Sequence, residues 1–190
     1  NPIYLDALLS GQEFWGGVVP KIGHHFIQVV SIEGFPLASS PGLINSLADL
    51  PCLYRWSTRF IFMDTHEAVG HLEKFSKKWK QKIRSFFDQV FNSHSSHVDQ
   101  NAMNMVSDAQ AAIAETNSGE VAQGYYTSVV VLMSENRGDL EAAARQVAKA
   151  VNHMGFTARI ETINTIDAYL GSLPGHGVEN VRRPLLNTLN

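Results

Sequence analysis

Basic residues gather in one short segment of the chain, among apolar residues spaced three and four apart. This spacing predicts a helix with one apolar stripe, which the basic side chains would flank. A basic helical face could bind nucleic acid, anionic lipid or an acidic protein partner. The alternative is a solvated outer face whose lysine stems cover apolar surface. The candidate partner-binding residues are Lys74, Lys77, Lys78, Lys80, Lys82 and Arg84.

A second set of basic residues could also recognise an anion. Arg55 and Arg59 lie on one face of a predicted strand, and Arg182 and Arg183 precede Pro184. A guanidinium group can bind phosphate or carboxylate through two parallel hydrogen bonds. The alternative, which the sequence favours, is that these arginines form ion pairs with Asp or Glu inside the fold.

The common signatures of catalysis are missing from the sequence. It has no Gly-Lys dipeptide and therefore no P-loop, and no Gly-x-Ser-x-Gly elbow. His66 and His71 are five apart, whereas a zinc-protease helix needs a spacing of four. His94 and His97 fall in a polar turn without a nearby cysteine or carboxylate pair. We therefore predict no catalytic, cofactor-binding or metal-binding residue in this chain.

The composition is that of a globular chain. Of its 190 residues, 44% are hydrophobic and 17% are charged, and the formal net charge is -3 at pH 7. This balance gives no general attraction to nucleic acid, so such binding requires a local patch. The single cysteine, Cys52, lies in an apolar stretch and is interpreted as a small buried hydrophobic residue. The apolar runs are far shorter than the roughly 20 residues of a transmembrane helix, so we expect a soluble chain.

Hydrophobic periodicity predicts strands and helices in a regular order. Residues 125–133 have the composition of a strand that is buried on both faces. Further strands are predicted at 25–32, 53–63 and 156–163, and short helices at 40–50 and 165–170. In the helix at 140–154, the spacing directs four residues inward: Leu140, Ala144, Val147 and Val151.

Two amphipathic helices lie between the second and third strands. Asp64 or Thr65 caps the first helix. The second helix runs from about residue 98 to residue 115 and follows a polar turn, so the two form an antiparallel hairpin of about residues 65–118. The buried stripe of the first helix is predicted as Leu72, Phe75, Trp79, Ile83, Phe86 and Val90.

The order of the elements predicts an α+β fold. A strand-helix-strand unit precedes the helical hairpin, and a second such unit follows it. This order indicates a ferredoxin-like split β-α-β sheet with the long helical hairpin inserted between its halves. We expect residues 1–170 to form a single α+β domain. Because residue 1 is not Met and residues 171–190 resemble a connection, we expect the chain to be a piece of a larger protein.

Four long, non-repetitive runs of the chain are recognisable together. They are SIEGFPLASSPGLINSLADLPCLYRWSTRFIFMD, KKWKQKIRSFFDQVFN, GYYTSVVVLM and GFTARIETINTIDAYLGSLPGHGVENVRRPLLNTLN. They resemble the N-terminal part of the VirB/CagE/TrbE family of conjugal-transfer and type IV secretion ATPases. The resemblance covers the chain from about Tyr4 to Asn190, and no catalytic motif carries it.

This resemblance implies that the parent protein is a cytoplasmic ATPase, peripheral to the bacterial inner membrane. In the family the Walker motifs, and with them ATP and Mg, belong to a RecA-like domain that follows this region. We therefore expect no cofactor in this chain and a linker at 171–190 that leads to a missing C-terminal ATPase domain. Arg182 and Arg183 are then expected at the interdomain junction.

The role implied for this region is non-catalytic assembly and docking, in an apparatus whose ATPase energises pilus assembly or the transfer of DNA and protein. The implied partners are other type IV secretion components at the inner membrane, the parent's own ATPase domain and, as a further possibility, a second copy of the chain.

The alternative function is a single-stranded nucleic-acid-binding module. Ferredoxin-like sheets can stack bases on exposed aromatic residues, and Tyr54, Trp56, Tyr125 and Tyr126 are available. The negative net charge and the lack of a glycine-aromatic RNP pattern count against this function.

Overall fold

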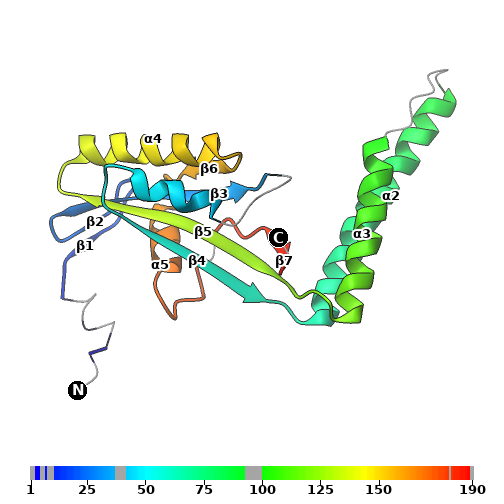
Figure 1. Cartoon of the computed structure of the whole chain (residues 1–190), viewed down its shortest axis with the longest axis horizontal. Coiled ribbons are helices and arrows are strands. Elements are labelled where there is room, and N and C mark those ends of the chain that lie inside the picture. The colour runs from blue at the N-terminus through cyan, green and yellow to red at the C-terminus, as the bar shows by residue number, and fades with distance from the viewer. Residues whose placement is uncertain are drawn as a thin grey trace. The chain divides into compact units, whose positions relative to one another are not determined.

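The structure is a computed structural model that describes residues 3–4, 7, 11–36, 42–92, 100–179 and 181–188. It has the predicted α+β architecture, with a mostly antiparallel sheet (Figure 1). The chain divides into two compact units. We call Asn1–Phe60 with Tyr126–Pro184 the sheet unit, and Ile61–Tyr125 with Leu185–Asn190 the hairpin unit.

The centre of the sheet is formed by β3 (His25–Gly34) and β5 (Gln123–Ser134), which run antiparallel. In this register Val30 lies opposite Val130, and the neighbouring Val29 lies opposite Val131. Because successive side chains alternate between faces, these pairs point to opposite sides of the sheet. Each side has its own hydrophobic cluster, which confirms the prediction of a strand buried on both faces.

In the sheet, strands from the first predicted half of the fold alternate with strands from the second half. Its order is β1-β2-β3-β5-β4, where β4 is Tyr54–Phe62, and β6 (Thr157–Ile160) also pairs with β3. β5 therefore lies between β3 and β4, and β3 lies between β5 and β6. This interleaving is consistent with a split β-α-β arrangement.

Three short strands were not predicted from the sequence. They are β1 (Phe14–Trp15), β2 (Lys21–Ile22) and β7 (Leu185–Asn187). β7 pairs with the start of β5, within the segment that was expected to be a linker. A strand of two or three residues is too short to show a hydrophobic period. These strands are therefore identified only by their pairing with neighbouring strands in the structure.

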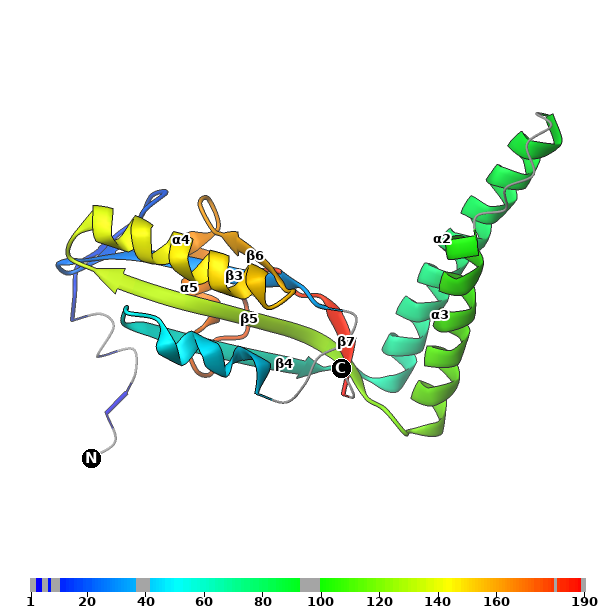
Figure 2. The same ribbon diagram turned by 45° about the horizontal axis from the view of Figure 1, so that its top comes forward.

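Helices cover both faces of the sheet unit. α4 (Arg137–His153) lies on one face and α5 (Thr165–Gly171) on the other (Figure 1). The 3-10 helix η1 (Leu43–Asp49) shares the α4 face, where its Leu47 joins the same hydrophobic cluster (Figure 2). As predicted, the residues that α4 buries are Leu140, Ala144, Val147 and Val151.

Local signals set the ends of α4. Asn136 Oδ1 accepts hydrogen bonds from the backbone N of Gly138 at 2.8 Å and of Asp139 at 3.3 Å, which satisfies N–H groups at the helix start. Gly155 follows the helix with a φ of 87°, a left-handed conformation that favours glycine. The chain then returns as β6, which ends at Ile160. The prediction that this strand continues to residue 163 is wrong, because the chain bends after Glu161 into the turn that precedes α5.

The hairpin unit contains α2 (Thr65–Asn92) and α3 (Gln100–Ser118), which pack against each other. The predicted helical hairpin is therefore confirmed. Asp64 caps α2, since its Oδ1 accepts a hydrogen bond of 2.8 Å from the backbone N of His66. None of the helices in the described residues combines the length and the apolar character that crossing a membrane requires.

The buried side of α2 differs from the predicted stripe. Ala68 and Ser76 are buried, and Leu72 is half-buried. The assignment of Phe75 to the stripe is wrong, because its side chain is 45% exposed. The periodicity of the sequence gives the spacing of buried residues along a helix, but it does not specify which side of α2 packs against α3. The other predicted stripe residues, Trp79, Ile83, Phe86 and Val90, have side chains outside the described portion of the structure.

Candidate functional site

The basic residues of α2 lie on its solvent-facing surface. Lys74, Lys77, Lys78 and Lys80 are all exposed. Lys77 Nζ is 3.8 Å from Glu73 Oε2, one turn earlier in the helix. An exposed pair of this kind contributes about 0.3–0.5 kcal/mol, so these side chains remain accessible to a partner. The side chains of Lys82 and Arg84 lie outside the described residues.

Arg182 forms an ion pair inside the sheet unit. Its Nε lies 3.0 Å from Glu161 Oε1, and its Nη2 lies 3.2 Å from Glu161 Oε2. The Glu161 side chain is only 2% exposed, and a buried carboxylate is costly without such a partner. The backbone of Arg182 has a φ of 53°, a conformation that non-glycine residues rarely adopt. The guanidinium group is therefore committed to an internal carboxylate.

A second arginine extends this network. Arg159 donates to both carboxylate oxygens of Glu33 at 3.0 to 3.1 Å, and Arg182 Nε lies 3.6 Å from Glu33 Oε2. The hydrogen bond from Arg159 lowers the pKa of Glu33, partly offset by burial, and the charges of Arg159 and Arg182 lower it further. The same hydrogen bond raises the pKa of Arg159. Glu33 is thus favoured in its charged form, in which it pairs with both arginines.

The arginines of β4 bind the end of α5. Arg59 Nη2 donates to Leu173 O at 3.1 Å, and Arg55 Nη2 donates to Ser172 Oγ. Ser57, on the same face of β4, donates to Ser172 O at 3.2 Å. These contacts satisfy main-chain and hydroxyl groups after the last turn of the helix. Arg55 and Arg59 therefore fix α5 to the sheet.

The interdomain role predicted for Arg182 and Arg183 stays a prediction. The structure assigns Arg182 to the ion pair with Glu161 and leaves Arg183 exposed.

The aromatic residues considered for nucleic-acid binding make contacts within the fold. Trp56 Nε1 donates to Ser128 Oγ at 2.7 Å, although the ring is 39% exposed. Tyr126 packs edge-on against Phe35 with ring centroids 5.4 Å apart. Tyr125 meets His71, and Tyr54 packs against the α4-face cluster. Each of these rings therefore makes contacts within the fold.

In the part of the chain that the structure describes, the histidines and the cysteine do not gather into a metal site. The described residues hold no group of three or more His, Cys, Asp or Glu side chains that could bind a metal ion. His71 Nε2 lies 3.8 Å from Glu67 Oε1, while His94 and His97 fall outside the described residues. Cys52 is half-buried against the α4-face cluster, and this burial raises the pKa of its thiol. The thiol form is therefore favoured over the nucleophilic thiolate.

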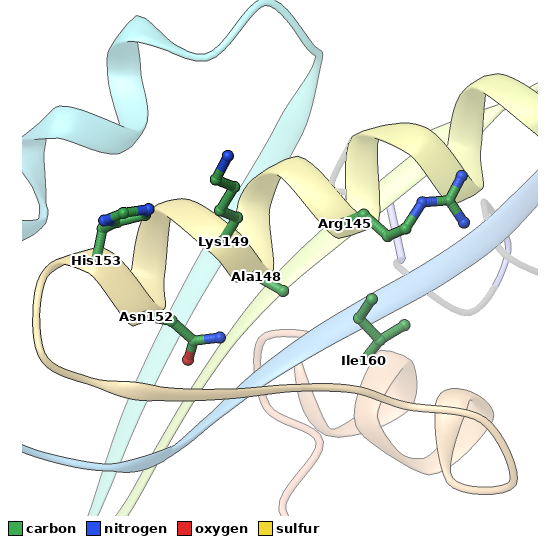
Figure 3. Close-up of a pocket in the computed structure, with 6 residues that line it drawn as sticks. All are labelled: Arg145, Ala148, Lys149, Asn152, His153 and Ile160. Atoms are coloured by element: carbon green, nitrogen blue, oxygen red, sulfur yellow. The ribbon is translucent and has the colours of Figure 1, made fainter.

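A hollow of about 440 Å³ lies between α4 and β6 (Figure 3). Its polar lining consists of Arg145, Lys149 and His153, which follow one another at intervals of four along α4, together with Asn152. Ala148 and Ile160 supply the apolar portion. Among the described residues no carboxylate lines this hollow, so it suits an anionic or hydrogen-bond-accepting group.

The basic row on α4, formed by Arg145, Lys149 and His153, was not predicted from the sequence. The spacing of four was visible in the sequence and would have placed the three residues on one helix face. The hollow itself was not visible, because it depends on β6 running beside the helix.

Comparisons with known proteins agree with the resemblance seen in the sequence. The model of the CagE, TrbE, VirB family, described as a component of type IV transporter system, matches residues 39–182. The whole chain is 48% identical over 189 residues to a probable conjugal transfer protein TrbE from Sinorhizobium fredii, and covers 28% of that protein. It is 47% identical over 189 residues to a conjugal transfer protein TrbE from Rhizobium radiobacter, and covers 23% of it. The chain thus spans about a quarter of the length of these relatives.

Proposed function

The chain belongs to the CagE, TrbE, VirB family of type IV transporter components, and from this membership we propose that it is a non-catalytic assembly and docking domain of a conjugal-transfer ATPase. The observation that carries the proposal is the identity of 48% over the whole chain to a conjugal transfer protein several times as long. A segment of this size within a larger protein can act by positioning the rest.

The chemistry of the chain supports a binding role. The sequence has no Gly-Lys dipeptide, which a P-loop requires. Arg55, Arg59, Arg159 and Arg182 are held by groups of the fold. The described basic side chains on α2 (Lys74, Lys77, Lys78 and Lys80) and the row on α4 are exposed instead. In this proposal ATP and Mg bind in another domain of the parent protein.

The proposed partners are other components of the secretion apparatus at the bacterial inner membrane, the parent's own ATPase domain and a second copy of the chain. The proposed location is cytoplasmic and peripheral to that membrane. Basic surfaces suit both settings, since anionic lipids and acidic proteins attract them.

The first test concerns catalysis. The purified chain is expected to hydrolyse no ATP and to show no saturable ATP binding by calorimetry, because the proposed nucleotide site lies elsewhere in the parent. Turnover that rises with the concentration of the purified chain would contradict the non-catalytic role.

The second test concerns docking. Donor cells that carry an intact conjugation system are made to produce the chain in excess. We expect the frequency of plasmid transfer to fall, because the chain occupies docking positions without bringing an ATPase domain. An unchanged frequency, with the chain present in excess over the native protein, would remove the docking role.

A further inference from the structure

The hollow beside α4 borders an open edge of the sheet. β6 pairs with β3 along one side, and among the described residues no strand pairs along its other side. An open strand edge offers main-chain N–H and C=O groups, to which an extended peptide can add as a further strand. Figure 3 shows Ile160 of β6 below Arg145 and Ala148 of α4, which line the same hollow.

The hydrogen-bond pattern identifies which groups of β6 face outward. The backbone N of Glu161 donates to Val29 O at 2.8 Å, so this pair is hydrogen-bonded. Because such pairs alternate along an antiparallel ladder, Arg159 also faces β3, whereas Ala158 and Ile160 direct their main-chain groups away from it. The contact from Ala158 N to Asn152 Oδ1, at 2.9 Å, agrees with this pattern.

The outward groups are only partly satisfied within the fold. Asn152 occupies the N–H of Ala158, which leaves the C=O of Ala158 and both main-chain groups of Ile160 turned outward. With its Oδ1 used in this way, Asn152 directs its amide Nδ2 toward the hollow (Figure 3). Asn152 thus closes the open edge of β6 at Ala158 and offers its amide Nδ2 as a hydrogen-bond donor next to that edge.

The charges beside the edge define what would bind there. Arg145, Lys149 and His153 recur at every turn of α4, at a repeat of about 5.4–6 Å. Alternate residues of a strand recur at about 6.6–6.8 Å, so acidic side chains at alternate positions could meet successive basic residues. Because no carboxylate among the described residues lines the hollow, an acidic segment would bind there in preference to a basic one.

We infer that the outer edge of β6 binds an extended acidic segment of a partner protein. The segment adds a strand to the sheet, pairs with Ile160 and places alternate carboxylates against Arg145, Lys149 and His153. This inference rests on the proposed docking role and names one surface that performs it.

The first experiment measures binding of a fluorescent peptide to the full 190-residue chain. The peptide, of about eight residues, alternates glutamate with threonine. We expect saturable binding that weakens about tenfold or more when Arg145, Lys149 and His153 are all replaced by Gln, because the ion pairs of Arg145 and Lys149 and the contacts of His153 are lost together. A matched variant, Lys74→Gln with Lys77→Gln and Lys78→Gln on α2, is expected to bind the peptide as the unmodified chain does.

Two altered peptides separate strand pairing from charge. A peptide with Gln in place of Glu keeps the main chain and loses the carboxylates, and a peptide methylated at alternate backbone nitrogens keeps the carboxylates and loses the donors. We expect both to bind at least about tenfold more weakly than the original. In hydrogen exchange monitored by NMR, the original peptide should protect the amide of Ile160, while Arg159, already bonded to β3, should change little.

Several results would overturn the inference. They are tight binding of the methylated peptide, unprotected Ile160 in the bound state, loss of binding in the α2 variant, or equal competition by a single-stranded oligonucleotide. Docking itself is assessed separately by sedimenting the chain with membranes from donor cells that contain or lack the transfer system. If the chain docks but fails to bind the peptide, the β6 edge is excluded and the docking role stands. If neither occurs, the proposed function fails as well.

Discussion

The sheet unit buries large apolar side chains on both faces of its strands, whereas the buried positions described in the helices of the hairpin unit carry small side chains. Val30 and Leu132 are nearly inaccessible in the sheet unit, while the hairpin helices bury Ala68 and Ala109. The sheet unit also contains an ion pair between the buried Glu161 and the partly exposed Arg182. In the hairpin unit, α2 instead exposes Lys74, Lys77, Lys78 and Lys80.

This difference predicts where substitutions matter. Burial of large apolar groups supplies most of the stability of a fold, so changes inside the sheet unit should be costly. Exposed charges on a helix contribute little to stability, so changes there should alter binding instead. The sheet unit would then maintain the fold, and the hairpin unit would present a surface.

The largest effect is expected from Leu132→Ala. Leu132 is 1% exposed within the α4-face cluster, and truncating such a residue costs about 2–5 kcal/mol through lost burial and a cavity. Urea unfolding followed by circular dichroism measures the loss. The matched control is Leu53→Ala, because Leu53 is 91% exposed and its truncation should change stability by less than about 0.5 kcal/mol. Equal losses for the two variants would refute the assignment of the core.

A smaller but clear loss is expected from Glu161→Gln. The substitution leaves Arg182 beside a neutral amide, so a partly buried charge loses its partner at a cost of about 1–3 kcal/mol. Glu120→Gln removes an equal charge at an exposed position and should be neutral by the same thermal or urea unfolding. If both variants were equally stable, the ion pair would have no structural role.

The pH dependence of stability should reveal Glu33. Its folded pKa is lowered, so its contribution is present above the ordinary glutamate pKa of about 4.3 and is lost as pH falls through the folded value. Because Arg159 is half exposed, this contribution should not exceed about 1 kcal/mol. Urea midpoints of the chain and of Glu33→Gln, measured between neutral and acidic pH, should therefore converge on acidification. A difference that is constant across this range would contradict the linkage.

The smallest effect on stability is expected on α2. Replacing Lys74, Lys77, Lys78, Lys80, Lys82 and Arg84 by Gln should leave the melting temperature nearly unchanged, since the described side chains are exposed and the Lys77–Glu73 pair is weak. Sedimentation with donor-cell membranes should nevertheless weaken. A variant that exchanges Lys for Arg and Arg84 for Lys keeps the charge and should bind normally. If the Gln variant sediments with the membranes as the unmodified chain does, the basic residues of α2 form only a solvated helix face and have no binding role.

Much of the fold could be predicted because its main elements carry regular patterns. The four buried positions of α4 follow from spacing alone, and Asn136 and Gly155 mark its ends. The prediction failed where the pattern was ambiguous. Phe75 has the right spacing for a buried stripe but lies beside it, because spacing does not specify which flank meets the other helix.

The candidate sites were predicted less completely. The exposed lysines of α2 were recognised because a dense run of charge is local in sequence. The hollow beside α4 was missed, since Ile160 reaches it only through the pairing of β6 with β3. The internal use of Arg182 was anticipated as an alternative, but its partner could not be named.

The sequence by itself determined the family, the order of the main elements and the side of α4 that is buried. These properties depend on similarity along the chain or on residues a few positions apart, so they survive without knowledge of the fold. Only the tertiary structure decided that Arg159 pairs with Glu33, that Arg182 pairs with Glu161 and that, among the described residues, β6 has an open edge beside a basic row. These properties depend on segments far apart in the chain, such as Glu33 and Arg159, which the packing of the sheet brings within hydrogen-bond distance.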